Sequence, residues 1–424
     1  MLLGCIADDF TGATDLAAML VANGMRTVQC IGAPRPGQVA PDADAVVVAL
    51  KSRTAPVAQA VAESLAALTW LRAAGARQIL FKYCSTFDST PEGNIGPVAD
   101  ALLAALEGGF ALACPAFPAN ARSVYQGHLF VGSALLNESG MENHPLTPMK
   151  DANLVRVLSQ QTEGTVGLVA HAVVAQGAEA IRKAMTALKE QGRRYAIVDA
   201  VEDAHLRAIG TAAAGHALIT GGSGIAMGLP ENFRAAGLLP RREDPGALPD
   251  IEGACAVLAG SCSRATLGQI GFARQGVEVY DVDALATPDA ARLAADAIAW
   301  AETRLGATPI VIAASAPPDK VAALQAALGR EAAGALIEDT MARIAEALVA
   351  RGLRRLVVAG GETSGAVVAR LGVASLRIGR EIDPGVPWTY AEGTGAPMLL
   401  ALKSGNFGGR NFFLKAFAML EEAP

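Results

Sequence analysis

The sequence predicts an α/β protein with two α/β domains, each built on a mainly parallel sheet, and a linker rich in proline and glycine between them. Three observations lead to this prediction. Short β-branched runs alternate with Ala- and Leu-rich stretches of helical periodicity, as in parallel strands joined by crossover helices. A length of 424 residues allows two or three domains. The alternation stops in residues 234–253, where three prolines, three glycines and mixed charges interrupt it.

We place the first domain at residues 1–233. Its first strand is an apolar run that ends at two adjacent acids, and a helix over 16–23 closes before Gly24. The clearest helix, 57–74, follows Pro56 and stops before a glycine, as helix termini prefer. Another helix is expected at 178–191. Apolar and β-branched runs predict strands at 2–7, 27–31, 45–50, 78–82, 110–114, 166–170, 195–199 and 217–220.

We treat residues 234–253 as the linker and 254–424 as the second domain, where the alternation of strands and helices starts again. Several of its apolar runs end in a turn that contains glycine, which marks the end of a strand. These runs predict strands at 254–259, 277–282, 309–314, 356–359, 376–379 and 398–403.

Charge and hydropathy exclude several classes of protein. The net charge of −6 and the absence of a basic block argue against a nucleic-acid partner. Mean hydropathy is high, at +0.32, but the longest uncharged run, 208–230, holds six glycines and several polar residues, unlike a membrane span. Two acids directly after the first apolar run do not fit a signal peptide, and the six cysteines form no Cys-x-x-Cys pair. We therefore expect a cytoplasmic protein with free thiols and no membrane partner.

Polar residues follow three strands of the first domain. The first strand runs into Asp8 and Asp9, and two later strands run into 51–54, which contains Arg53, and 82–90, which begins with Lys82. Carboxyl ends of parallel strands form the ligand-binding edge of such sheets, so these residues are expected to face one crevice. Acids suit hydroxyl groups and cations suit a carboxylate, which predicts a polyhydroxy acid as ligand. Helix capping at the acids and solvated surface charge at the cations are the alternatives.

Glycine-rich turns are the second recurring feature. Three in the second domain follow an apolar strand and precede a helix, at 259–264, 359–365 and 403–409. Backbone amides without a Cβ and a helix N-terminus suit a phosphate, and three such turns favour a nucleotide. A fourth turn, 221–224, is either an anion loop or a tight turn. The chain has no Walker-type phosphate loop, Gly-x-Gly-x-x-Gly, Gly-x-Ser-x-Gly or His-Glu-x-x-His motif, and the spacing of its five histidines indicates no metal site.

Together these motifs resemble the four-carbon acid sugar kinases over nearly the whole chain, above all the branch that phosphorylates 3-oxo-tetronate. The resemblance rests on 7–15, 82–90, 221–224 and the three glycine turns, and on 114–118, 125–127 and 144–149. The sequence departs from the family pattern at 121–123 and at Gly409, which leaves the local loop shape open.

The resemblance implies a substrate-binding first domain, a nucleotide-binding second domain, and ATP-dependent phosphorylation of a C4 hydroxyl. It implies ATP contacts at Ser261, Ser263, Gly360, Gly361, Glu362, Thr363 and Gly405, and substrate contacts at Asp8, Asp9, Arg53, Lys82, Ser85 and Thr86. We expect Asp9 or Asp8 to act as base, and Mg²⁺ to bind ATP with a carboxylate such as that of Glu362, its full ligand set being open. Domain closure over the linker is also expected.

Three alternatives stay open at this point. A kinase of the same family could act on D-threonate or erythronate instead. A nucleotide-linked dehydrogenase or a non-catalytic acid-sugar sensor would also use acids and glycine turns, although the missing Gly-x-Gly-x-x-Gly disfavours the dehydrogenase. A homo-oligomer is possible, and an aldolase or decarboxylase would take the product by pathway only.

Overall fold

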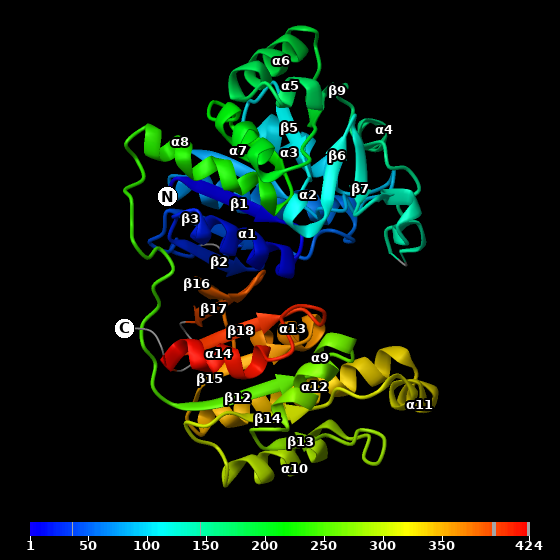
Figure 1. Cartoon of the computed structure of the whole chain (residues 1–424), viewed down its shortest axis with the longest axis vertical. Coiled ribbons are helices and arrows are strands. Elements are labelled where there is room, and N and C mark those ends of the chain that lie inside the picture. The colour runs from blue at the N-terminus through cyan, green and yellow to red at the C-terminus, as the bar shows by residue number, and fades with distance from the viewer. Residues whose placement is uncertain (36, 145, 392–395, 422–424) are drawn as a thin grey trace. The chain divides into compact units, whose positions relative to one another are not determined.

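The computed structural model describes residues 1–35, 37–144, 146–391 and 396–421. Contacts divide the chain into two compact units, Met1–Gly246 and Ala247–Pro424, here called unit 1 and unit 2. Figure 1 shows helices and strands alternating along both. In the part of the chain that is described, no helix combines the length and apolar character of a membrane span.

Unit 1 contains a parallel sheet with the strand order β2-β3-β1-β4-β11-β5-β10-β9. The register places Ala7, the last residue of β1, opposite Ala49 of β3 and Lys82 of β4. The residues that follow these three strands therefore emerge at one level of the carboxyl edge. The strands are β1 (Leu3–Ala7), β2 (Thr27–Ile31), β3 (Ala45–Ala49), β4 (Gln78–Lys82), β5 (Ala111–Cys114), β9 (Val166–Val169), β10 (Tyr195–Val198) and β11 (Leu218–Gly221).

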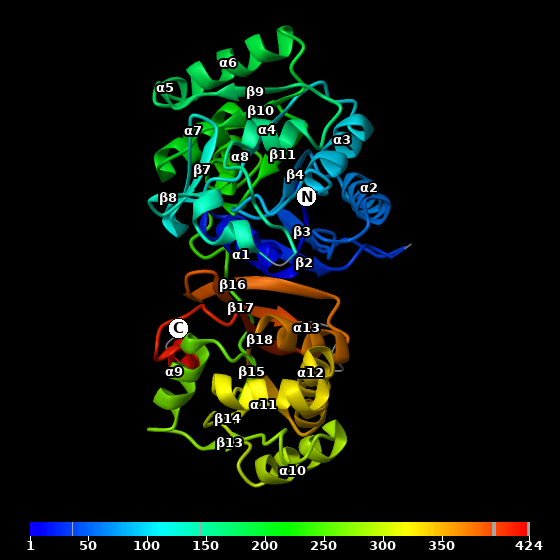
Figure 2. The same ribbon diagram turned by 90° about the vertical axis from the view of Figure 1, so that its right-hand side faces the viewer.

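Helices cover both faces of this sheet, as a doubly wound topology requires. Figures 1 and 2 show α1, α6 and α7 on one face and α2 and α3 on the other. Nearly every residue of the central strands is buried, which explains their continuous apolar sequence. The helices are α1 (Phe10–Ala22), α2 (Val57–Ala73), α3 (Ile95–Ala105), α4 (Leu154–Ser159), α5 (His171–Val174), α6 (Ala178–Glu190), α7 (Asp203–Ala212), α8 (Leu229–Ala235) and the 3-10 helices η1 (Pro118–Asn120), η2 (Leu136–Glu138), η3 (Met141–Asn143) and η4 (Ser223–Gly228).

A small antiparallel sheet in unit 1, β6 (Arg122–Tyr125), β7 (His128–Val131) and β8 (Ala134–Leu135), was not expected from the sequence. These strands are short and half-exposed, so their sequence lacks the buried apolar runs of the main sheet. Buried Asp199 ties the β6–β7 turn to the end of β10, because its carboxylate accepts backbone hydrogen bonds from Gln126 (2.7 Å) and Gly127 (2.9 Å).

Unit 2 contains a mixed sheet with the order β13-β14-β12-β15-β18-β17-β16, in which β16 and β17 are antiparallel to their neighbours and the other strands are parallel. Ala259, Ala359 and Lys403 lie side by side at the ends of β12, β15 and β18. The strands are β12 (Ala254–Ala259), β13 (Val279–Asp281), β14 (Ile310–Ala313), β15 (Leu353–Ala359), β16 (Ser375–Asp383), β17 (Val386–Ala391) and β18 (Met398–Lys403).

The core of unit 2 packs Phe412 and Phe417 of its last helix against the sheet, where Trp388 of β17 is fully buried. The Trp388 indole N–H donates to the Ala416 carbonyl at 2.8 Å, which satisfies the polar atom of this large side chain. The helices are α9 (Arg264–Ala273), α10 (Ala290–Glu302), α11 (Pro318–Leu328), α12 (Arg330–Ala350), α13 (Gly361–Arg370) and α14 (Phe412–Glu421).

The predicted fold class, two α/β units with mainly parallel sheets, is confirmed. Strands β2, β4, β12 and β18 have the predicted bounds, and most others differ by one or two residues. The first helix begins at Phe10 rather than residue 16, because the Asp9 side chain caps it. Strand β17 was not expected, although nearly all of it is buried, and β16 is longer than predicted, because its buried positions are interrupted by exposed ones in an antiparallel hairpin.

Candidate functional site

Two adjacent carboxylates stand at the carboxyl end of β1. The chain leaves the strand at Asp8, whose backbone N–H donates to the Lys82 carbonyl at 3.1 Å. The Asp8 carbonyl then accepts the N–H groups of Ser52 (3.0 Å) and Arg53 (3.2 Å), so the loops after β1, β3 and β4 are joined by backbone hydrogen bonds. Asp9 is the N-cap of α1, and its Oδ2 accepts the Gly12 N–H at 3.1 Å. The predicted capping and the predicted crevice therefore occur together.

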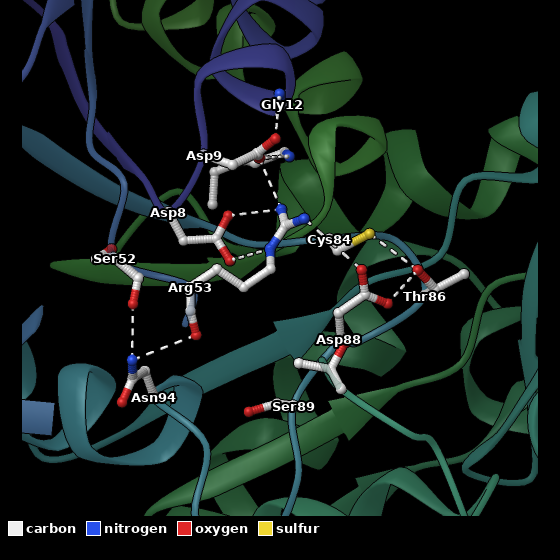
Figure 3. A network of polar contacts seen from close by, with 12 residues as sticks. Asp8, Asp9, Gly12, Ser52, Arg53, Cys84, Thr86, Asp88, Ser89 and Asn94 are labelled. Atoms are coloured by element: carbon white, nitrogen blue, oxygen red, sulfur yellow. Dashed lines mark hydrogen bonds and ion pairs between the residues drawn. The ribbon is translucent and has the colours of Figure 1, made fainter. Parts of the chain in front are cut away.

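The guanidinium of Arg53 organises these acids. Its Nε and Nη2 each lie 2.9 Å from an oxygen of Asp8 in a bidentate pair, and Nη2 also donates to Asp9 Oδ1 at 2.7 Å. Figure 3 shows Arg53 between Asp8 and Asp9 on one side and Asp88 on the other, with Asp88 Oδ2 3.7 Å from Nη1. The structure thus brings Arg53 together with both predicted acids, and most donors of its guanidinium fork are directed at protein carboxylates.

Lys82, the last residue of β4, supplies a second cation. Its side chain is 4% exposed, and Nζ lies 3.7 Å from Asp9 Oδ1. A Cβ on Gly12 would lie 2.0 Å from this Nζ and 2.3 Å from Asp9 Oδ1, so only glycine allows α1 to begin so close to the ammonium. Among the described residues, Lys82 Nζ is therefore paired with one carboxylate, whereas the Arg53 guanidinium is paired with three.

The loop after β4 is shaped by a strained residue. Phe87 is fully buried and has a φ of 52°, a left-handed conformation that a bulky side chain rarely adopts. On either side of it, Thr86 Oγ1 donates to Asp88 Oδ1 at 2.6 Å and contacts the Cys84 thiol at 2.9 Å. Predicted Ser85 is half-buried in the same loop. A small pocket beside this loop is lined by apolar Phe81, Ile95 and Val98 and by the polar residues Asp8, Ser52, Arg53, Asp88, Ser89 and Asn94.

The two adjacent acids have different acidities. Burial raises the pKa of Asp8, while the Arg53 guanidinium acts in the opposite direction. Burial also acts to raise the pKa of Asp9, but Lys82, Arg53 and the Gly12 N–H outweigh it and lower that pKa. The Asp9 side chain is 28% exposed, against 6% for Asp8. Asp9 is therefore the charged acid that a ligand can reach, and Asp8 is the acid held beneath Arg53.

The glycine turns of unit 2 meet at the carboxyl edge of its sheet. Ser263 caps α9, and its hydroxyl donates to the Gly405 carbonyl at 2.5 Å. A Cβ on Gly405 would lie 2.3 Å from Ser261 Oγ, and a Cβ on Gly260 would lie 2.2 Å from Thr363 Oγ1. The predicted ATP contacts Ser261, Ser263, Thr363 and Gly405 thus converge from loops far apart in sequence.

The turn after β15 adds a helix N-terminus to this group, which we call the glycine cup (Ser261, Ser263, Gly360, Gly361, Thr363 and Gly405). Gly360 has a φ of 136° and precedes α13, so predicted Gly361, Glu362 and Thr363 form the first turn of that helix. Gly361 and Glu362 are exposed, whereas Thr363 is buried. Free amides and the positive helix end make this turn suitable for a phosphate.

The structure also identifies site residues that the sequence analysis did not single out. In unit 1, Asp88 joins the Arg53 group, and Asp15 of α1, whose pKa burial raises, accepts a hydrogen bond from Ser223. In unit 2, Lys403 Nζ donates to Thr266 Oγ1. Asp15 closes the polar motif 7–15 and Lys403 is the charged end of an apolar strand, so both positions could have been recognised from the sequence.

The turn at 221–224 is explained by packing. A Cβ on Gly221 would lie 2.3 Å from the Cys114 carbonyl oxygen, and one on Gly222 would lie 2.7 Å from that of Pro115. These glycines therefore permit close contact with the chain that follows β5. Within the described residues, no group of three or more His, Cys, Asp or Glu side chains is arranged to hold a metal ion.

Comparisons with known proteins match each unit to a family model. A sugar-binding N-terminal domain matches residues 3–229, and a nucleotide-binding C-terminal domain matches 256–413. The chain is 60% identical to a 3-oxo-tetronate kinase of Cupriavidus necator (99% of this chain, 97% of the relative) and 59% identical to one of Burkholderia multivorans (100% and 98%). A solved Salmonella typhimurium LT2 structure, provisionally described as a tRNA synthase, has a TM-score of 0.91 and 43% identity over 98% of both chains.

The two matched domains and these relatives define the protein as a kinase that transfers a phosphoryl group from a nucleotide to a small molecule. More particularly, the chain belongs to the four-carbon acid sugar kinase family. The resemblance seen in the sequence is thus confirmed, and the dehydrogenase alternative is not favoured. A nucleotide-binding domain in a kinase implies the use of ATP.

Proposed function

We propose that the protein phosphorylates the C4 hydroxyl of 3-oxo-tetronate with ATP, giving 3-oxo-tetronate 4-phosphate and ADP. The relatives with this name support the choice of substrate. The observation that carries the proposal is the group of Asp8, Asp9, Arg53 and Lys82, which places accessible carboxylate oxygens beside two cations at one sheet edge. Such a group complements a small acid that also bears hydroxyls.

Within this proposal the four charged residues have distinct roles. Lys82 contacts the anionic end of the substrate, because within the described residues its ammonium is paired with Asp9 alone, whereas Arg53 is held by three carboxylates. Asp8 and Asp88 hold Arg53, and Arg53 in turn fixes the position of the Asp9 carboxylate. Ser85 and Thr86 lie in the adjoining loop, where Thr86 holds Asp88 through its hydroxyl and Ser85 is assigned to contact with the substrate.

Asp9 orients the C4 hydroxyl for in-line attack. During transfer a bond forms between O4 and the γ-phosphorus, the bond from that phosphorus to the ADP oxygen breaks, and the hydroxyl proton passes to Asp9. The low pKa of Asp9 keeps it ionised before the step, so it can accept a hydrogen bond from the hydroxyl. Because the transition state is loose, orientation matters more than strong basicity.

The glycine cup binds the ATP phosphates in this scheme, through backbone amides, the Ser261 hydroxyl and the first turn of α13, while the Ser263 hydroxyl donates to the Gly405 carbonyl and holds the cup together. Mg²⁺ fits this chemistry, since it is usually held by phosphate oxygens, water and one or two carboxylates, and Glu362 is an exposed carboxylate at that turn. When bound, the ion would neutralise phosphate charge.

The test is ADP release across a panel of four-carbon acids, repeated with Asp9→Asn. We expect turnover of 3-oxo-tetronate, and a loss of about 10²- to 10⁴-fold in kcat for the variant with ATP affinity retained. Asp151→Asn is a matched control, because Asp151 pairs with Arg156 in an exposed ion pair. Turnover of D-threonate or erythronate without 3-oxo-tetronate would contradict the choice of substrate. Full activity of Asp9→Asn would contradict the role of Asp9.

A further inference from the structure

A buried lysine lies beneath the glycine cup. Lys403 ends β18 and is 1% exposed, one of the largest fully buried side chains in the described chain. Its Nζ donates to the Gly405 carbonyl (2.9 Å), to Thr266 Oγ1 (3.0 Å) and to the Ser404 carbonyl (3.1 Å). These bonds use all three ammonium donors within the protein.

The carbonyl of Gly405 is where these bonds converge. It accepts hydrogen bonds from Ser263 Oγ and from Thr266 Oγ1 (2.9 Å) in addition to Lys403 Nζ. This fixes the loop after β18 against the start of α9. Gly405 is thereby held so close to Ser261 that a single added carbon would collide with the serine hydroxyl. Lys403 thus helps to fix the positions of Ser261, Ser263 and Gly405 relative to one another.

The positive charge of Lys403 has no opposite charge beside it. Within the part of the chain that is described, no carboxylate forms an ion pair with this ammonium, and its burial lowers its pKa to about 8. Burying an unpaired charge costs free energy, which a fold does not gain back from three neutral acceptors alone. An anion that binds next to the cup would supply the missing opposite charge.

We propose that Lys403 is a positioning residue that holds the Gly405 loop and provides the buried positive charge against which the nucleotide phosphates bind. This inference rests on the proposed placement of ATP in the glycine cup. Lys403 acts through the loop and through its electric field, since its donors are already occupied. The contribution should therefore grow with the number of phosphates on the nucleotide, which a purely structural role would not produce.

The test compares the Kd of AMP, ADP and ATP for wild type, Lys403→Met and Lys403→Gln by titration calorimetry. We expect about a 10- to 100-fold weaker Kd for ATP in a folded neutral variant, a smaller loss for ADP and the smallest for AMP. Thr266→Val is the matched control, because it removes one acceptor and keeps the charge. Its loss should be about equal for the three nucleotides.

Each outcome decides a different point. If wild type does not bind ATP, the proposed function fails, and the inference falls with it. If wild type binds ATP but a folded neutral variant binds it equally well, or loses AMP and ATP affinity alike, the proposed function stands and the role of Lys403 is wrong. If neither neutral variant folds while wild type binds ATP, Lys403 serves the fold rather than the nucleotide, which also overturns the inference.

Discussion

Replacing Arg53 by methionine should destabilise unit 1 in a pH-dependent way. The Asp8 side chain is 6% exposed and that of Asp88 is 9% exposed, so removing the guanidinium leaves two buried carboxylates without their shared cation. Breaking a buried ion pair costs about 3–5 kcal/mol, and the 23% exposure of Arg53 favours the lower end, about 3 kcal/mol at pH 8.

The sign of the pH dependence follows from Asp8. Burial already raises its pKa in the folded protein, and loss of Arg53 removes the main opposing influence, so the folded-state pKa rises further above its unfolded value. Protonation then favours the folded state as pH falls. The deficit of Arg53→Met relative to wild type should therefore shrink between pH 8 and pH 5.

The assay is urea unfolding followed by the fluorescence of Trp70, the one tryptophan in residues 1–246, in a background with Trp300→Phe and Trp388→Phe. Arg156→Met is the matched control. Arg156 makes a bidentate pair with Asp151 at 2.7 Å, but the pair is exposed, so its loss should change stability little at any pH. A deficit that stays constant or widens toward pH 5 would refute the argument from burial.

Two further predictions concern backbone positions. Gly405→Ala should raise the KM for ATP about 10-fold and leave the KM for the sugar acid unchanged, because the new Cβ collides with Ser261 Oγ. Gly268→Ala is the control. Gly268 lies on the open face of α9, so this variant should leave both KM values unchanged. An unchanged KM for ATP in Gly405→Ala would show that the loop adjusts at no cost. Ala121→Gly should preserve or raise the Tm by a few °C (about 1 kcal/mol), because Ala121 has a φ of 57°, which glycine adopts without strain. A clear drop in Tm would contradict this prediction and would mean that packing of the alanine methyl group outweighs the backbone strain.

The sequence was most informative where burial dictated residue type. The parallel strands are continuous apolar runs, so their positions and the polar residues after them, such as Asp8 and Lys82, could be predicted together. The glycine-containing turns after β12, β15 and β18 could be predicted as well, because each follows a buried apolar strand. The short strands β6 to β8 could not, because half-exposed antiparallel strands have no such run.

The interior of the site was harder to predict than its outline. Sequence patterns placed Arg53 and Lys82 in one crevice, but they did not show that Arg53 is bound to both Asp8 and Asp9 while Lys82, in the part of the chain that is described, is paired with Asp9 alone. Likewise, Lys403 stood in a motif without an assigned role until the three acceptors around its Nζ were known. Such pairings depend on side-chain directions across loops, which a linear pattern does not record.

The strained Phe87 in the loop after β4 has a consequence for how this enzyme can adapt to other substrates. The ring centroids of Phe87 and Tyr83 lie 5.3 Å apart, edge to face, and those of Tyr83 and Phe81 lie 5.5 Å apart. These contacts fix the middle of the loop that carries Thr86 and Asp88 against the sheet. Such a segment cannot swing like a lid. Redesign toward a longer sugar acid should therefore vary individual side chains around this fixed point and keep the loop length.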